Sequence, residues 1–264
     1  MSLLEAVALG LVQGLTEFFP VSSSGHLVLA EALLDVNPPG VAFEVLVHLA
    51  TALSVLVLYR GRLVALFAGA LRKQSDDLRY LGLLGLASVP AVLLGFTLSG
   101  AIARLFDRPV LTAVSLLVTG AVVYATRWLL ARGERGHPGW GGSLAVGIAQ
   151  AVALVPGISR SGVTVATALW ARTRRERAAE FSFLLSVPAI LGASFLELPE
   201  LTSVEFRVGT AELAAACLSA FAGGMLAIVL FVRWLRAGRF HRFAYYCWAV
   251  GAGYIVYALV AGLS

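Results

Sequence analysis

Two short polar segments carry the residues of this chain that could do chemistry. In the first segment, Gln13 precedes Glu17 by one helical turn, and Ser23 precedes His26 by about one turn. The two members of each pair therefore share a helical face. A hydroxyl beside an imidazole, with a carboxylate nearby, is the general form of an activated nucleophile. The segment predicts Ser23, His26 and Glu17 as catalytic residues.

The second segment has the chemistry of an anion site. Arg160 stands between two serines, and its planar guanidinium can hold two phosphate oxygens at once, which a lysine does less well. Each segment follows a proline, and a helix that starts after this break presents free N–H groups and the positive end of its dipole. Small residues let the backbone approach closely. We therefore expect the following residues to bind phosphate: Arg160, Ser159, Ser161, Thr164, Ser22, Ser24, Gly25, Gly162 and Gln13.

Taken one at a time, these signals have ordinary structural explanations. A run of serines after a proline is more often a helix cap or a turn. Glu17 could be a packing residue that is hydrogen-bonded across helices. His48 lies in an apolar run without an obvious titratable partner, so we expect it to link two helices. Arg160 is the hardest to explain structurally, because an arginine at a buried tip needs an anion.

The polar segments belong to a chain dominated by apolar residues. Its 264 residues are 59% hydrophobic and only 13% charged, and the mean hydropathy is +0.87. A soluble domain carries roughly a quarter charged residues. The net charge is +5, but the basic residues lie at the ends of apolar runs, which is typical of membrane proteins rather than of nucleic-acid binding. We predict an all-α integral membrane protein, a single domain over residues 1–264 in a lipid bilayer, with no nucleic-acid partner.

Eight apolar regions follow one another along the chain. Six are long enough to span a bilayer at about 20 residues each, and they cover residues 41–59, 80–99, 109–128, 181–196, 211–232 and 243–263. The other two, residues 3–34 and 143–171, are broken in the middle by proline and hydroxyl residues. The arm after each break is about 18 Å long as a helix, which is too short to span. Each broken region should therefore be a re-entrant hairpin.

The two broken regions are also copies of each other. Each half of the chain, 1–134 and 135–264, is interpreted as one re-entrant hairpin plus three transmembrane helices, so the second half should be inverted relative to the first. An inverted repeat would bring the two polar tips together near the middle of the bilayer. Most Lys and Arg residues then lie on one side, which the positive-inside rule assigns to the cytoplasm, with both termini outside. A constant offset pairs Gly10 with Gly147, Gln13 with Gln150, Ser22 with Ser159, Ser24 with Ser161 and Gly25 with Gly162.

Residues 13–26 and 156–164 closely resemble the two signature motifs of the undecaprenyl-pyrophosphate phosphatases, the bacitracin-resistance family. The resemblance extends to residues 181–189 and covers nearly the full length. It implies a multi-pass enzyme of the bacterial plasma membrane whose active site opens to the outer face. Such an enzyme hydrolyses undecaprenyl pyrophosphate, a prenyl pyrophosphate lipid, to undecaprenyl phosphate and inorganic phosphate. This reaction recycles the lipid carrier for peptidoglycan synthesis, and excess enzyme protects against bacitracin.

The resemblance also implies roles for individual residues. The family's glutamate-rich motif matches Gln13 and Glu17, its serine–histidine element matches Ser23 and His26, and its phosphate-binding arginine matches Arg160. A divalent cation, Mg²⁺ or Ca²⁺, is implied, with Glu17 as its ligand. Gln13 stands where many members have glutamate, which argues against a tight two-carboxylate site. We therefore expect the cation to arrive with the pyrophosphate.

Three questions stay open at the level of the sequence. Inverted repeats with broken helices are also typical of secondary transporters, so a transporter or flippase of an anionic lipid phosphate is the alternative function. Either Ser23 or His26 could be the nucleophile. A homodimer is compatible with the sequence.

Overall fold

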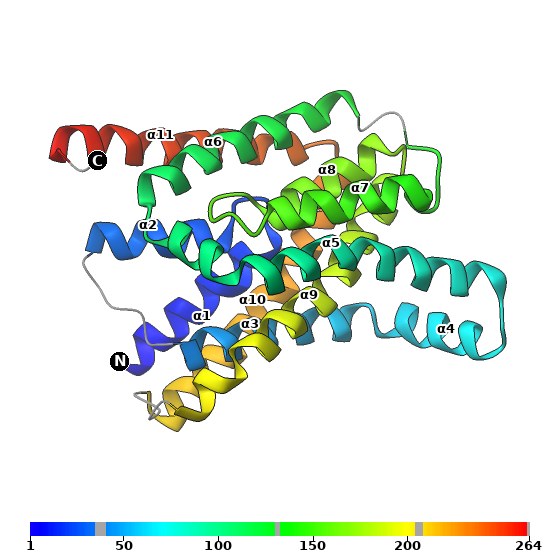
Figure 1. Cartoon of the computed structure of the whole chain (residues 1–264), viewed down its shortest axis with the longest axis horizontal. Helices are drawn as coiled ribbons and strands as arrows, with labels where there is room; N and C mark the ends of the chain where they lie inside the picture. The colour runs from blue at the N-terminus through cyan, green and yellow to red at the C-terminus, as the bar shows by residue number, and fades with distance from the viewer. Residues whose placement is uncertain (35–40, 130–132, 204–207, 263–264) are drawn as a thin grey trace.

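The described part of the chain is built from helices. The computed structural model describes residues 1–34, 41–129, 133–203 and 208–262. Within these ranges the one pairing of extended backbone is an isolated bridge between Arg135 and Thr173. The prediction of an all-α fold is confirmed (Figure 1).

Five described helices are long and apolar enough to cross a membrane. A bent pair, in which α3 (Val41–Leu58) meets α4 (Arg60–Leu71) at 72°, passes the same test when its two helices are taken together, and it is either a broken span or a re-entrant loop. The predicted spans are therefore confirmed as membrane candidates, although the first one is continued by a helix at a steep angle rather than ending at residue 59. The other five are α5 (Ser75–Phe106), α6 (Pro109–Ala125), α9 (Arg175–Ser203), α10 (Thr210–Arg236) and α11 (Phe243–Ala261).

Helix α5 is much longer than the apolar run that predicts it. It begins at Ser75 with Asp76 and Asp77 in its first turn, where acidic side chains favour the positive end of the helix dipole. It ends with Arg104 in the last turn, where a basic side chain is favourable. Near the end of the predicted run, Leu98 departs from helical geometry at φ −121° and ψ 16°. The polar caps therefore extend the helix beyond its apolar run.

The two predicted hairpins are present. In the first, α1 (Leu3–Phe18) is followed by α2 (Ser23–Leu34), and in the second, α7 (Gly139–Val152) is followed by α8 (Arg160–Trp170). Both second arms begin with the same cap: the hydroxyl of Ser22 accepts the Gly25 N–H, and the hydroxyl of Ser159 accepts the Gly162 N–H. Helix α8 is about 17 Å long at 1.5 Å per residue. It is too short to span a bilayer, as predicted.

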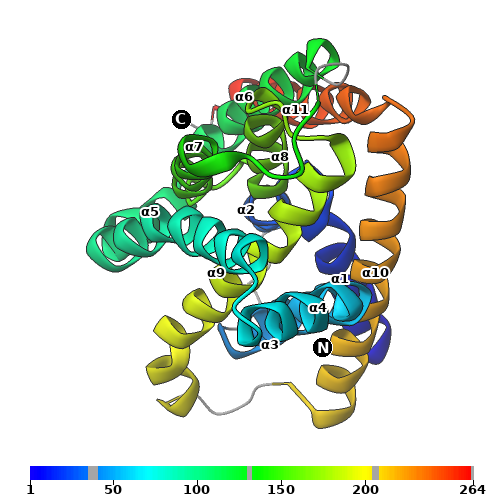
Figure 2. The ribbon, with the colours of Figure 1, turned by 90° about the vertical axis from the view of Figure 1, so that its right-hand side faces the viewer.

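Each hairpin packs on a long helix of the other half of the chain. Helix α1 lies along α10, and α7 lies along α5 (Figures 1 and 2). Glycines make both contacts possible. A Cβ at Gly10 would lie 2.2 Å from the Ala216 carbonyl oxygen, and a Cβ at Gly147 would lie 2.6 Å from the Ala87 carbonyl oxygen. Gly10 and Gly147 are a pair in the predicted repeat. This exchange of partners is consistent with the inverted repeat, which stays a prediction.

Candidate active site

The tips of the two hairpins touch each other. The Ser22 hydroxyl accepts the N–H of Gly157 at 3.2 Å, and the Ser161 hydroxyl donates to the Phe19 carbonyl oxygen at 3.1 Å. A Cβ at Gly25 would lie 2.9 Å from the Cα of Gly157. The two polar segments, far apart in the sequence, therefore form one site.

Helix α6 supports the second tip through a buried threonine. Thr119 donates its hydroxyl to the Gly157 carbonyl oxygen at 2.8 Å and accepts the Ser159 N–H at 3.0 Å. Gly157 has φ +90°, a conformation that L residues with a side chain rarely adopt. Thr119 therefore holds a turn that requires glycine, and the sequence analysis missed it because it lies within an apolar span.

Glu17 is the centre of the site. Its Oε1 lies 2.6 Å from Nη2 of Arg160, and its Oε2 accepts the Ser23 hydroxyl at 2.9 Å. The Gln13 amide donates to the same Oε2 at 3.1 Å. The side chains of Glu17 and Arg160 are only 8% and 15% exposed. Four predicted residues thus form one hydrogen-bonded cluster around a shielded ion pair, and we call Gln13, Glu17, Ser23 and Arg160 the Glu17 cluster.

His48 is a site residue that the sequence analysis missed. Its Nε2 lies 3.7 Å from Oε2 of Glu17, and its Nδ1 donates to the Glu44 carbonyl oxygen at 2.8 Å. The expectation that His48 links two helices agrees with this contact. Its partner lies on α1, and only the packing of α3 against α1 brings the two together.

His26 does not contact Ser23 in the way that the sequence predicts. Its Nδ1 lies 2.8 Å from the Ser22 carbonyl oxygen, and its Nε2 lies 2.8 Å from the Tyr246 hydroxyl. Both ring nitrogens are therefore occupied, while the Ser23 hydroxyl is bonded to Glu17. The expected contact between His26 and the Ser23 hydroxyl is therefore not formed, and the Ser23 hydroxyl donates to Glu17 instead.

Several predicted phosphate ligands hold the protein together instead. The hydroxyl of Ser159 caps α8 and contacts that of Ser161 at 3.2 Å. Thr164 donates to the Arg160 carbonyl oxygen and contacts the Ser182 hydroxyl. Ser24 is half-buried and lies 3.3 Å from the Ser22 hydroxyl. In this structure Ser22, Ser159, Ser161 and Thr164 are buried, and the N–H groups of Gly25 and Gly162 are capped. Direct contact of these residues with phosphate stays a prediction.

Arg160 has one half of its guanidinium unused. Nη2 is paired with Glu17, whereas Nη1 is buried and has no hydrogen-bond partner among the described residues. A buried charged donor without a partner is costly. An anion beside Ser23 and the start of α8 would satisfy it, and this is the strongest structural sign of a phosphate site.

The described residues do not form a preformed metal site. No group of three or more His, Cys, Asp or Glu side chains among them could hold an ion. The two oxygens of Glu17 already accept from Arg160, Ser23 and Gln13. Mg²⁺ and Ca²⁺ prefer several oxygen ligands. The protein side of the site therefore does not fit a tightly held divalent cation.

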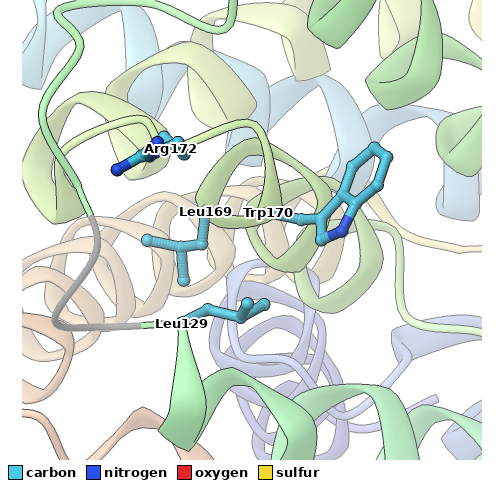
Figure 3. Close-up of a pocket in the computed structure, with 4 residues that line it drawn as sticks. All are labelled: Leu129, Leu169, Trp170 and Arg172. Atoms are coloured by element: carbon cyan, nitrogen blue, oxygen red, sulfur yellow. The ribbon is translucent and has the colours of Figure 1, made fainter.

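An open cavity of about 370 Å³ lies away from this site. It is lined by Leu129, Leu169, Trp170 and Arg172, at the opposite end of α8 from Arg160 (Figure 3). Its one charged side chain, Arg172, pairs with Glu134 at 2.7 Å. The cavity contains no member of the Glu17 cluster, so we assign the chemistry to the hairpin tips.

We expect Gly25→Ala to disrupt the site without removing any reactive group. The new methyl would meet the Gly157 backbone at 2.9 Å, which would force the tips apart. Phosphate release should fall by at least about tenfold, together with a lower melting temperature. Gly85→Ala is the matched control, since a Cβ there meets nothing within 4 Å. Equal activity of the two variants would show that the tips need not touch.

Comparison with known proteins shows the family to which this chain belongs. The sequence pattern of the family described as "Bacitracin resistance protein BacA" matches residues 6–253. A protein of Desulforapulum autotrophicum named "Undecaprenyl-diphosphatase" is 39% identical, over 99% of this chain and 100% of its own length. A protein of Alcanivorax borkumensis with the same name is 39% identical, over 100% of this chain and 98% of its own. A protein of Syntrophotalea carbinolica, also named "Undecaprenyl-diphosphatase", is 40% identical, over 95% of this chain and 97% of its own length. The chain therefore belongs to the bacitracin resistance protein BacA family.

Proposed function

We propose that this membrane protein is an undecaprenyl-diphosphatase, which hydrolyses undecaprenyl pyrophosphate to undecaprenyl phosphate and inorganic phosphate. The observation that carries the proposal is the buried, unpartnered Nη1 of Arg160 beside a serine that is bonded to a carboxylate. An anion-binding group next to an activated hydroxyl is what phosphoryl transfer needs. The names of the full-length relatives agree with this reaction.

The first half of the reaction uses the Glu17 cluster. Arg160 and the N–H groups at the start of α8 hold the terminal phosphate. The Ser23 oxygen forms a bond to the terminal phosphorus, and the bond from that phosphorus to the bridging oxygen breaks, which releases the lipid monophosphate. The Ser23 proton moves to Oε2 of Glu17, to which it is already hydrogen-bonded at 2.9 Å. The product of this half is a phosphorylated Ser23.

The second half needs a water molecule and a base. Ser23 and His26 lie about one turn apart on α2 and share a face. A water oxygen bonds to phosphorus, its proton moves to Nε2 of His26 after the water has replaced the Tyr246 hydroxyl there, and Ser23 leaves with the proton held by Glu17. Inorganic phosphate departs, and His26 returns its proton to solvent. Glu17 and His26 thus serve the two halves separately.

The divalent cation is assigned to the substrate. The phosphate oxygens of a pyrophosphate are the hard ligands that Mg²⁺ and Ca²⁺ prefer. Because Glu17 is occupied, the ion would be held mainly by these oxygens, and it would offset their negative charge.

The prenyl chain keeps the substrate in the membrane. Each buried methylene contributes about 0.8 kcal/mol, so the lipid reaches the site sideways between helices. We place the protein in the bacterial plasma membrane with its active site open to the outer face, where it recycles the lipid carrier for peptidoglycan and gives resistance to bacitracin. A homodimer is compatible with this function and is not required by it.

A transporter of anionic lipid phosphates is the second candidate. The two broken helices that meet at their tips favour it. Binding alone does not require a serine hydroxyl bonded to a carboxylate. A direct assay separates the two functions.

The protein purified in detergent should release inorganic phosphate from a prenyl pyrophosphate. Detergent abolishes any gradient, so turnover there requires an enzyme. Arg160→Lys should reduce phosphate release by about 10²-fold or more, because the charge stays while the planar group that binds Glu17 through Nη2 and phosphate through Nη1 is lost. Arg104→Lys, on α5 away from the Glu17 cluster, is the control. Absence of phosphate release from the unaltered protein would overturn the proposed function.

Labelling of single cysteines should report the orientation. A cysteine replacing Asp107, between α5 and α6, should react with an impermeant reagent added outside the cell, because the positive-inside rule places that loop outside. One replacing Ser75, at the other end of α5, should react only after the membrane is opened. Both are introduced after Cys217 and Cys247 are changed to alanine. Labelling of both positions from outside would exclude this topology.

A further inference from the structure

The open cavity at the C-terminal end of α8 has an amphipathic lining (Figure 3). Leu169 belongs to the hydrophobic core, and Leu129 packs against that core. Trp170 is 68% exposed, and the side chain of Arg172 is 55% exposed. The volume of about 370 Å³ lies within the range of ligand pockets, roughly 300–1,000 Å³. Apolar side chains, an indole and a guanidinium together match a molecule that is apolar at one end and anionic at the other.

Exposed tryptophans gather around this cavity at the ends of three helices. Trp128 ends η1 (Thr126–Trp128), Trp140 is the second residue of α7 and Trp170 ends α8; they are 56%, 51% and 68% exposed. Helix α8 contacts η1, and a Cβ at Gly142 of α7 would lie 2.8 Å from the Ala171 Cβ. Tryptophans at the ends of membrane helices mark the headgroup level of a bilayer. The cavity therefore lies where lipid headgroups are.

The chain around the cavity is strongly basic. The carbonyl oxygen of Arg172 accepts the N–H groups of Glu134 and Arg135 at 2.9 and 3.0 Å, which joins the chain before α7 to the end of α8. Four arginines and one carboxylate stand on the three described segments that carry or contact the lining residues, 124–129, 133–137 and 169–174. Clusters of basic side chains beside membrane helices bind anionic headgroups.

The backbone of Arg172 indicates that its side chain has a use. Arg172 has φ +62° and directly follows Ala171, the C-cap of α8. Glycine is the usual residue in this position, because it has no Cβ to strain the left-handed conformation. The guanidinium pairs with Glu134 at 2.7 Å, but the Glu134 side chain is 67% exposed. An exposed ion pair contributes little to stability, so a phosphate can compete for the guanidinium.

We propose that this cavity binds one anionic phospholipid of the surrounding leaflet. Its phosphate is held by Arg172, and the first part of an acyl chain lies on Leu129 and Leu169. The ring of Trp170 lies beside the glycerol backbone, the level of the bilayer that tryptophan prefers. The positive-inside rule assigns this end of the molecule to the cytoplasmic leaflet. The site is separate from the Glu17 cluster, and the inference does not rest on the proposed function.

The first test counts bound lipids. Native mass spectrometry of the delipidated full-length protein, titrated in detergent with phosphatidylglycerol, should show one lipid that binds more tightly than the others. Arg172→Gly should weaken this binding by at least about tenfold, as expected for the loss of a charge-assisted hydrogen bond. Lys73→Gly is the matched control, because Lys73 has φ +58° directly after the C-cap of α4 and does not line the cavity. Equal affinity of the two variants would overturn the proposal.

Thermal unfolding separates loss of the lipid from loss of the fold. Arg172→Gly should melt in lipid-free detergent at or above the temperature of the unaltered protein, because glycine relieves the positive φ. Added phosphatidylglycerol should raise the melting temperature of the unaltered protein and of Lys73→Gly, since a ligand of the folded state stabilises it. The rise should be smaller for Arg172→Gly. Equal rises in all three proteins would place the lipid elsewhere.

The second test keeps Arg172 and locates the lipid. Phosphatidylglycerol with brominated acyl chains quenches the fluorescence of nearby tryptophans. Trp170→Phe should remove part of the quenching that saturates at one lipid per protein. Trp140→Phe is the control, because Trp140 does not line the cavity. Saturable quenching that is the same in Trp170→Phe as in the unaltered protein would contradict binding in the cavity.

Competition decides the class of the occupant. We expect phosphatidylethanolamine, a prenyl phosphate and inorganic phosphate, each at equal concentration, to leave phosphatidylglycerol bound. Displacement by phosphatidylethanolamine that is lost in Glu134→Gln would make the occupant a zwitterionic lipid whose ammonium group pairs with Glu134. Displacement by the prenyl phosphate would assign the cavity to the product of the proposed reaction. Displacement by inorganic phosphate would reduce the cavity to an anion site that does not recognise a lipid.

Discussion

Replacing Glu17 by glutamine should reduce phosphate release by about 10²–10⁴-fold, the range for removal of a general base. The carboxylate accepts the Ser23 hydroxyl and pairs with Arg160, so the change removes the base and leaves a shielded guanidinium without its counter-ion. Breaking one partner of a buried ion pair costs about 3–5 kcal/mol of folding free energy. The melting temperature in detergent should therefore fall as well.

Glu17→Asp is the matched control for this prediction. It keeps the charge but shortens the side chain by one methylene. The melting temperature should therefore fall little, whereas phosphate release should fall strongly. Adding Mg²⁺ or Ca²⁺ should not rescue Glu17→Gln, because the cation is assigned to the substrate. Rescue by excess cation would instead make Glu17 a metal ligand. Turnover near that of the unaltered protein would remove Glu17 from the reaction.

Replacing Ser23 by alanine should lower turnover by about 10³-fold or more, as expected when a nucleophile is lost. Binding of a non-hydrolysable methylene diphosphonate lipid should stay within a few-fold, because Arg160 is unchanged. The control is Ser24→Ala, whose hydroxyl contacts Ser22 rather than Glu17 and whose loss should have a small effect. The measurements are phosphate release and calorimetric binding.

Chemical trapping then identifies the nucleophile. A phosphorylated serine survives acid, whereas a phosphorylated histidine does not. Radiolabel that is stable in acid in the unaltered protein and absent from Ser23→Ala would agree with attack by Ser23. Acid-labile radiolabel that persists in Ser23→Ala would transfer the role of nucleophile to His26.

The fold could be predicted largely from local features of the chain. Apolar runs of about 20 residues have few alternatives to a spanning helix, because lipid cannot satisfy free backbone groups. Pro20 and Pro156 interrupt such runs, and the nearby serines Ser22 and Ser159 supply caps, so the starts of α2 and α8 follow from local sequence. The steep bend between α3 and α4 was not predictable, because the one glycine beside it, Gly61, does not by itself set the angle between two helices.

The candidate site, like the fold, was predictable from the sequence only in part. The sequence by itself determined which residues carry chemistry, because Glu17, Ser23, His26 and Arg160 are polar or charged groups at breaks in apolar helices. Only the tertiary structure decided their partners. Glu17 rather than His26 lies beside Ser23 because Arg160 comes from the other hairpin and draws the carboxylate between the tips. The contacts of His48 and Tyr246 depend on the packing of helices that are far apart in the sequence. The spacing of residues along one helix does not predict such contacts.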